Sequence, residues 1–118
     1  MEKFHDKLKI KIDEYVHFVY EISRKFPKEE MYGVISQIRR AALSVMLNYI
    51  EGFARIKSKV NLNFLEISYG SLKETKYLLH FSLKENYLNE TDYQKVIKMA
   101  EEIGAMLWKT IESIKEKG

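Results

Sequence analysis

Apolar residues recur at alternating steps of three and four along most of the chain, in four successive segments separated by short breaks. This spacing places them along one side of an α-helix, because a helix turns by about 100° per residue. A helix with one apolar stripe buries it against other helices. Four such helices with short connections predict an all-α fold, an antiparallel up-down-up-down four-helix bundle, formed by a single domain over residues 1–118.

The breaks between the segments have physical causes. Proline disfavours helix in the residue before it and has no N–H to donate, so the first helix should end at Pro27. The second is predicted over about residues 29–56, with Ser58 capping the third helix and Asn89 capping the fourth. The four predicted stripes are Leu8, Ile12, Tyr15, Val19, Ile22 and Phe26; Met31, Ile35, Ile38, Ala42, Val45, Tyr49, Gly52 and Ile56; Leu62, Leu65, Tyr69, Leu72, Leu79 and Leu83; and Tyr93, Val96, Ala100, Ile103, Leu107 and Ile114.

Composition supports the helical prediction and excludes several classes of protein. One Pro and five Gly are too few for the many tight turns of a β-sandwich or barrel. The absence of Cys excludes disulfides, thiolate zinc sites and cysteine nucleophiles. The sequence has no stretch of about 18 apolar residues and no signal-peptide pattern, so we expect a cytoplasmic protein that does not enter a membrane.

The second predicted helix is apolar on two sides. Its second apolar stripe lies well around the helix from the core stripe and consists of Leu43, Leu47, Ile50 and Ala54. The third predicted helix repeats the feature with Phe64, Ile67 and Leu78. Scattered exposed apolar residues are normal, but one small bundle cannot bury both sides of one helix. We therefore predict a homo-oligomer packed through the second and third helices, with Leu43, Leu47 and Ile50 at the interface.

The remaining face of the second helix is polar. It consists of Gln37, Arg40, Ser44, Asn48, Glu51 and Arg55, in which Glu51 and Arg55 have the spacing of an ion pair. Such a stripe is typical of a solvated face, a polar network between subunits, or part of a ligand surface. Because it adjoins two apolar faces, we include Gln37, Ser44, Asn48 and Glu51 in the predicted subunit interface.

The positive charge of the chain is concentrated in one region. The net charge is +3, yet residues 24–59 carry eight Lys or Arg against three Glu. This excess indicates either a solvated basic surface or a binding surface for a polyanion. The candidate nucleic-acid-binding residues are Arg39, Arg40, Arg55, Lys57 and Lys59, with Arg24, Lys25 and Lys28 in support.

The sequence offers no convincing catalytic or metal site. Glu14 and His17 have the spacing of a ferritin-like ligand pair, but the core stripe points them outward and no second such pair exists. The three histidines stand at no informative spacing to any serine. Trp108 and the eight tyrosines are dispersed along the sequence and predict no platform for stacking bases. We expect no catalytic residue, metal or cofactor.

Several of these residues also carry a resemblance to a known family. The segments are Phe26-Pro27-Lys28-Glu29-Glu30-Met31-Tyr32-Gly33, Ser36-Gln37-Ile38-Arg39-Arg40-Ala41-Ala42, Ser44, Asn48, Glu51-Gly52, Phe64-Leu65 and Gly70-Ser71-Leu72. They resemble the bacterial 23S rRNA intervening-sequence protein family, from which the chain departs at Tyr49-Ile50, where the family has a small or aliphatic pair. The resemblance implies a four-helix bundle that assembles as a ring-like pentamer. A similar bundle is the accessory protein of diversity-generating retroelements, which binds a reverse transcriptase and nucleic acid.

Two classes of function remain open at this point. The first is a non-catalytic oligomeric module that binds RNA or DNA through phosphate contacts. The second is a protein-interaction scaffold, such as an adaptor for a nucleic-acid enzyme. An enzyme is a distant third.

Overall fold

The computed structural model describes residues 2–55 and 57–117, and every regular element in those ranges is helical. The elements are α1 (Glu2–Ser23), the short 3₁₀ helix η1 (Lys28–Glu30), α2 (Val34–Ala54), α3 (Ser58–Lys84) and α4 (Glu90–Lys117). The prediction of an all-α fold with four α-helices is therefore confirmed.

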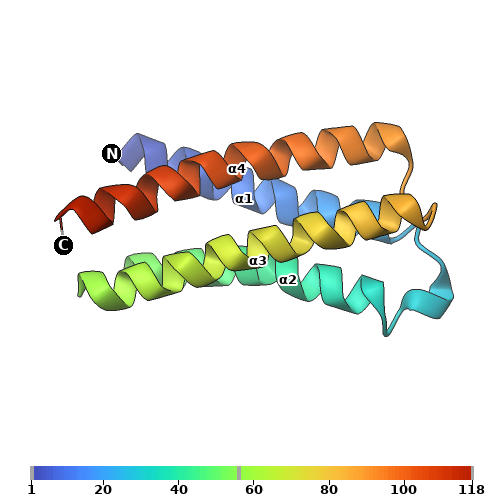
Figure 1. Ribbon diagram of the computed structural model, residues 1–118, viewed down its shortest axis with the longest axis horizontal. Helices are drawn as coiled ribbons and strands as arrows, with labels where there is room; N and C mark the ends of the chain where they lie inside the picture. The colour runs from blue at the N-terminus through green and yellow to red at the C-terminus, as the bar shows by residue number, and fades with distance from the viewer. Residues whose placement is uncertain (1, 56, 118) are drawn as a thin grey trace.

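The four helices lie side by side in an elongated molecule of 45 × 25 × 19 Å. In Figure 1, α1 and α4 form the upper pair and α2 and α3 the lower pair. Each helix packs against two others, since α1 contacts α2 and α4, and α3 contacts the same two helices. Both ends of the chain lie at the same end of the molecule (Figure 1).

The core between the helices is built from the predicted stripes. The α1 stripe from Leu8 to Phe26 is wholly buried, as are the α2 residues from Ile35 to Gly52 that belong to its core stripe. On α4, the side chains from Val96 to Leu107 on the predicted stripe are buried. Ile56 falls outside the described residues. Periodicity therefore identified the inward face of α1, α2 and α4 correctly.

The start of the second helix differs from the prediction. Residues 28–33 form η1 and a turn, and α2 begins only at Val34. The Glu30 carboxylate supplies the reason: its Oε1 accepts the N–H of Val34 at 3.2 Å, and its Oε2 accepts the hydroxyl of Tyr87 at 2.9 Å. Met31, predicted in the core stripe, is exposed on this turn. Glu30 thus caps α2 from the preceding turn and ties it to the start of α4.

The ends of the other helices confirm one predicted cap and correct another. Asn89 Oδ1 accepts the N–H of Asp92 at 2.7 Å, so Asn89 caps α4 as predicted. Asn86, where the helical pattern breaks, adopts a positive φ of 64°, which Asn tolerates better than most residues. Ser58 is the first residue of α3 rather than its cap, and the side chain of the preceding Lys57 makes no cap hydrogen bond.

Small hydroxyl residues line the side of α3 that faces α2. The buried members are Ser68, Ser71, Thr75 and Ser82. Ser68 Oγ donates to the carbonyl of Val45 at 2.7 Å, which satisfies the hydroxyl inside the seam between the helices. Leu78, predicted to point outward toward another subunit, is instead buried on this side of α3. The small side chains let α2 and α3 approach closely.

Candidate interaction surfaces

The outer face of α2 carries a line of exposed apolar side chains, which we call the α2 apolar stripe: Leu43, Leu47 and Ile50. Leu47 is the most exposed of the three, at 57%. On the neighbouring helix α3, Val60 and Ile67 are also exposed. Two adjacent helices of one chain therefore present large apolar side chains on the outer side of the bundle.

The polar stripe of α2 lies beside this surface and turns partly into the seam with α3. Ser44 Oγ and Ser71 Oγ share a hydrogen bond of 2.7 Å. Asn48 Nδ2 donates to the Ser44 carbonyl and to Ser44 Oγ, both at 2.9 Å. Ser44 and Asn48, predicted at the subunit interface, thus form hydrogen bonds within the chain. Sequence periodicity did not anticipate this network, because its partner Ser71 lies on another helix.

The outer end of the polar stripe holds the predicted ion pair. Arg55 Nη2 lies 2.6 Å from Glu51 Oε2, and both side chains are about half exposed. The Arg55 guanidinium also lies over the Phe64 ring, 5.1 Å from its centroid. These contacts place Arg55 across the outer ends of α2 and α3.

A shallow groove of about 420 Å³ runs between α2 and α3 near the middle of the polar stripe. Its lining consists of Gln37, Arg40, Ala41, Ser44, Ser71 and Glu74. Arg40 and Glu74 bring opposite charges to the two sides of the groove. The groove therefore suits a polar partner with charges of both signs better than a uniform polyanion.

The candidate nucleic-acid-binding residues do not form one continuous patch. Arg55, Lys57 and Lys59 lie at the connection between α2 and α3, and all three are exposed. The supporting residues Arg24, Lys25 and Lys28 lie before the start of α2, so the length of that helix, about 30 Å, separates the two groups. Lys25 is also paired with Asp92 at 3.3 Å. The basic region of the sequence therefore becomes two groups at opposite ends of α2.

Arg39 serves a contact between helices. Its Nε donates to Ser23 Oγ at 2.8 Å, and its Nη2 donates to the Tyr20 carbonyl at 3.4 Å. The guanidinium lies over the Tyr20 ring, 4.8 Å from the centroid. Arg39 therefore clamps α2 to the end of α1, whereas its neighbour Arg40 is exposed.

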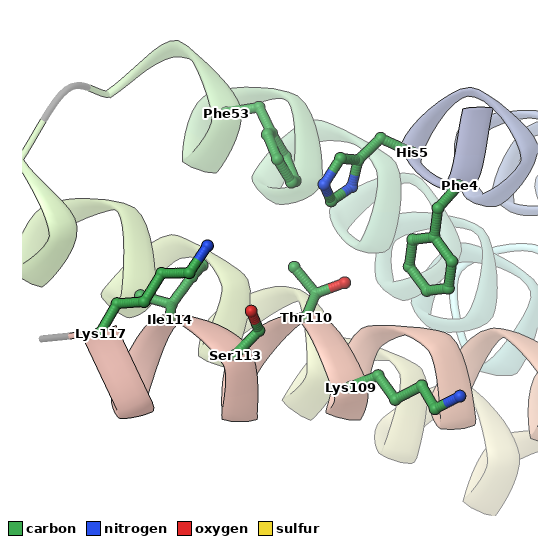
Figure 2. A pocket seen from close by; sticks show the side chains of 8 residues that line it. All are labelled: Phe4, His5, Phe53, Lys109, Thr110, Ser113, Ile114 and Lys117. Carbon is green, nitrogen blue, oxygen red and sulfur yellow. The ribbon is translucent and has the colours of Figure 1, made fainter. Parts of the chain in front are cut away.

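A pocket of about 320 Å³ opens at the end of the bundle where the chain ends lie. Figure 2 shows Phe4 and His5 from α1 and Phe53 from α2 on the side opposite to the lining residues of α4. The His5 and Phe53 rings are 4.4 Å apart, and His5 Nδ1 lies 3.3 Å from the Tyr49 hydroxyl. Burial lowers the pKa of His5, while burial and the Asp6 carboxylate raise the pKa of Tyr49 to about 12.

The far side of the molecule brings together two aromatic residues that the sequence analysis treated as dispersed. The rings of Tyr69 on α3 and Trp108 on α4 lie 5.5 Å apart between centroids, at an angle of 43°. A groove of about 310 Å³ adjoins them. The available signal was that Trp108 follows the core residue Leu107, which turns it to the side of α4.

Metal and membrane sites were also sought among the described residues. No group of three His, Asp or Glu side chains there is placed to hold a metal ion. Glu14 and His17 are both exposed, and His17 Nε2 lies 3.5 Å from Asp13. Within the same ranges, no helix combines the length and the apolar character needed to cross a bilayer.

Comparisons with known proteins agree with the fold. A crystal structure at 1.70 Å resolution of a protein of unknown function, from the S23 ribosomal protein family of Bacteroides thetaiotaomicron VPI-5482, matches with a TM-score of 0.85. The two chains are 21% identical, and the match covers 92% of this chain and 98% of that one. No curated protein is significantly similar to the chain. The family model for the 23S rRNA-intervening sequence protein matches residues 8–109, so the chain belongs to that family.

Proposed function

We propose that this protein is a non-catalytic subunit of a ring-like homo-oligomer, a pentamer, that binds RNA or DNA through basic side chains. In this proposal each subunit is an antiparallel up-down-up-down bundle. The observation that carries the assembly is the α2 apolar stripe, which lies on the side of α2 away from the core. The subunit number of five rests on the resemblance to the family.

The geometry of the exposed apolar residues favours a cyclic assembly. The α2 apolar stripe and the pair Val60 and Ile67 are different surfaces on two adjacent helices. Two different surfaces suit a head-to-tail contact, in which one surface of a subunit meets the other surface of its neighbour. Head-to-tail contacts close into a ring when the rotation between subunits divides a full turn. Gln37, Ser44, Asn48 and Glu51 would lie at the edge of this contact.

Nucleic-acid binding is supported by the basic group at the connection between α2 and α3. Lys57 and Lys59 are exposed there beside Arg55, and Arg40 is exposed further along α2. Arg39 contributes less, because α1 occupies two of its nitrogens. A ring repeats the basic group once per subunit, which turns a small local charge into a multivalent surface for phosphates.

The assembly is tested by placing a charge in the α2 apolar stripe. We expect Leu47→Glu to dissociate the oligomer, because the contact would bury an unpaired carboxylate. Ile10→Glu is the matched control, since Ile10 is 59% exposed on α1, outside the proposed contact. Native mass by light scattering should fall for Leu47→Glu alone. An unchanged mass for Leu47→Glu would contradict a contact through α2.

The nucleic-acid proposal is tested by the salt dependence of binding. We expect Lys57→Ala combined with Lys59→Ala to weaken RNA binding and to flatten its salt dependence by about 0.7 per lost single-strand contact. The matched control removes the exposed Lys9 and Lys98. Both variants keep Arg55 and its ion pair with Glu51. If wild-type protein binds neither single-stranded RNA nor duplex DNA at low salt, the proposal fails.

A second candidate function is a protein-interaction scaffold, for which the groove of mixed charge between α2 and α3 is the specific observation. Such a scaffold would be related to the accessory proteins of diversity-generating retroelements, with a reverse transcriptase as its partner. A reverse-transcriptase gene beside the gene for this protein would favour this alternative. Co-purification of that enzyme with wild-type protein, and its loss in Arg40→Glu, would then support the groove as its binding site.

A further inference from the structure

The aromatic pair formed by Tyr69 and Trp108 differs from the aromatic residues of the core. Trp108 is 46% exposed, although Trp is a residue whose large surface usually packs away from water. Tyr69 is half-buried and packs against the core, so it holds the pair in place from the α3 side. The indole is thus a large, fixed and accessible aromatic surface.

The groove beside this pair is kept open by small side chains. Its floor is formed by Leu72, Ala100, Gly104 and Ala105, and its walls include Tyr69 and Trp108. A Cβ added at Gly104 would meet only Leu72 Cδ2, at an ordinary 3.4 Å. Packing between α3 and α4 therefore does not require glycine at this position. At about 310 Å³, the groove falls at the lower end of the range for small-ligand pockets.

Three lysines surround the aromatic pair. Lys73 Nζ lies 5.2 Å from the centroid of the Tyr69 ring, and Lys115 Nζ lies 5.8 Å from that of Trp108. Lys76 is the third and lines the groove. Two carboxylates are near: Glu101 lines the groove, and Glu66 lies 3.8 Å from Lys115. The lysines outnumber the carboxylates, so the surroundings of the aromatic pair favour an anion.

The basic side chains continue along α3 toward the connection with α2. Lys59 and Lys73 are fourteen residues apart, close to four full turns, so they lie on the same face of α3 about 21 Å apart. This face links the aromatic pair to the lysines already proposed to contact phosphates. A strand bound at Lys57 and Lys59 is thus directed toward Trp108.

We infer that the groove between α3 and α4 binds one unpaired base of a single-stranded RNA or DNA, stacked on Trp108, with flanking phosphates on Lys73 and Lys76. This inference rests on the proposed nucleic-acid function and specifies the form of nucleic acid that is bound. A duplex keeps its bases stacked inside, whereas single strands present them to exposed aromatic rings. Because every base has an aromatic face, the site would discriminate weakly between sequences.

The protein carries its own reporter for this site, because Trp108 is the single tryptophan of the chain. Titration of the wild-type protein with oligo(dT) at low salt should quench the tryptophan fluorescence to a saturating level. A duplex of equal length should bind without this quenching. Anisotropy of a labelled oligo(dT) measures the affinity independently of the tryptophan.

The variant Trp108→Leu should lower the affinity for oligo(dT) about tenfold, as expected for the loss of one stacked base. Its affinity for duplex DNA should stay unchanged. Tyr32→Leu is the matched control, since Tyr32 is 96% exposed on the turn before α2, far from the groove. Lys73→Gln should weaken the binding of oligo(dT) less than Trp108→Leu and should reduce its salt dependence. Circular dichroism and native mass should not change.

The two proposals fail in different ways. If wild-type protein binds oligo(dT) without quenching, or if Trp108→Leu binds it as tightly as wild type, the stacking site is wrong and the basic surface at the α2–α3 connection stands. If wild-type protein binds no nucleic acid, both proposals are wrong.

Discussion

Ser44 on α2 and Ser71 on α3 share a hydrogen bond of 2.7 Å between their hydroxyl oxygens. With the bond from Ser68 to the Val45 carbonyl, it joins the two helices that carry the proposed subunit contact. The polar stripe of α2 thus holds α2 to α3 inside each chain. The apolar stripe of the same helix remains on the outside. Stability of the chain and assembly of the oligomer should therefore respond to different substitutions.

The first prediction concerns this seam. Ser71→Ala should lower the free energy of unfolding by about 1 kcal/mol, because Ser44 loses its partner across the seam. The native mass should stay unchanged. Urea unfolding at one fixed protein concentration measures the effect. Ser58→Ala is the control, and should change stability by less than about 0.5 kcal/mol because Ser58 is exposed and does not cap α3. Equal losses for the two variants would contradict this assignment.

A second prediction uses the buried hydrogen bond between Tyr15 and Thr75, whose oxygens lie 2.7 Å apart. Thr75 Oγ1 donates to the Leu72 carbonyl, so the Tyr15 hydroxyl is the donor to Thr75. Tyr15→Phe should cost about 1 kcal/mol, whereas Thr75→Val leaves a buried hydroxyl without its acceptor and should cost up to about 3 kcal/mol. Thermal unfolding of the two variants gives the order. The reverse order would show that the tyrosine hydroxyl finds another partner.

Two glycines in helices should respond in opposite ways to alanine. A Cβ at Gly70 on α3 meets nothing within 4 Å, so Gly70→Ala should stabilise the chain by about 0.5–1 kcal/mol. A Cβ at Gly52 on α2 would lie 3.0 Å from Leu65 and 3.3 Å from the carbonyl oxygen of Asn61. Gly52→Ala should therefore destabilise the chain by about 1 kcal/mol or more. Denaturation midpoints that move in the same direction would contradict this contrast.

Stability should fall in alkaline solution. Burial and the Asp6 carboxylate raise the pKa of Tyr49 to about 12, and burial also raises the pKa of Tyr15. In the unfolded chain these phenols ionise near pH 10, so between about pH 10 and pH 12 the unfolded state binds fewer protons and gains free energy relative to the folded state. The free energy of unfolding should decrease over this range. The decrease should be smaller in Tyr49→Phe, and an identical pH profile for both proteins would refute the role of Tyr49.

Helical periodicity was sufficient to predict most of the fold. Ile12 and Val19 on α1, and Val96 and Ile103 on α4, are buried as their spacing requires. The local chemistry of Asn89 also predicted the start of α4. These features depend on residues close in sequence, and therefore a single chain segment contains the necessary information.

Features that depend on the rotation of one helix against another were not predictable in this way. The late start of α2 depends on the Glu30 carboxylate, which reaches both Val34 and Tyr87. The contact of Arg39 with Tyr20 and the meeting of Tyr69 with Trp108 likewise join separate helices. Periodicity locates a side chain on its own helix. It does not determine which side chain of the neighbouring helix lies opposite.

The native mass of the wild-type protein tests the central proposal, assembly through the α2 apolar stripe, most directly. Size exclusion coupled to light scattering at micromolar concentration gives this mass without reference to shape. A ring of five subunits predicts about five times the chain mass of 14.1 kDa. A single species of 14.1 kDa that persists as the concentration is raised would contradict the proposal.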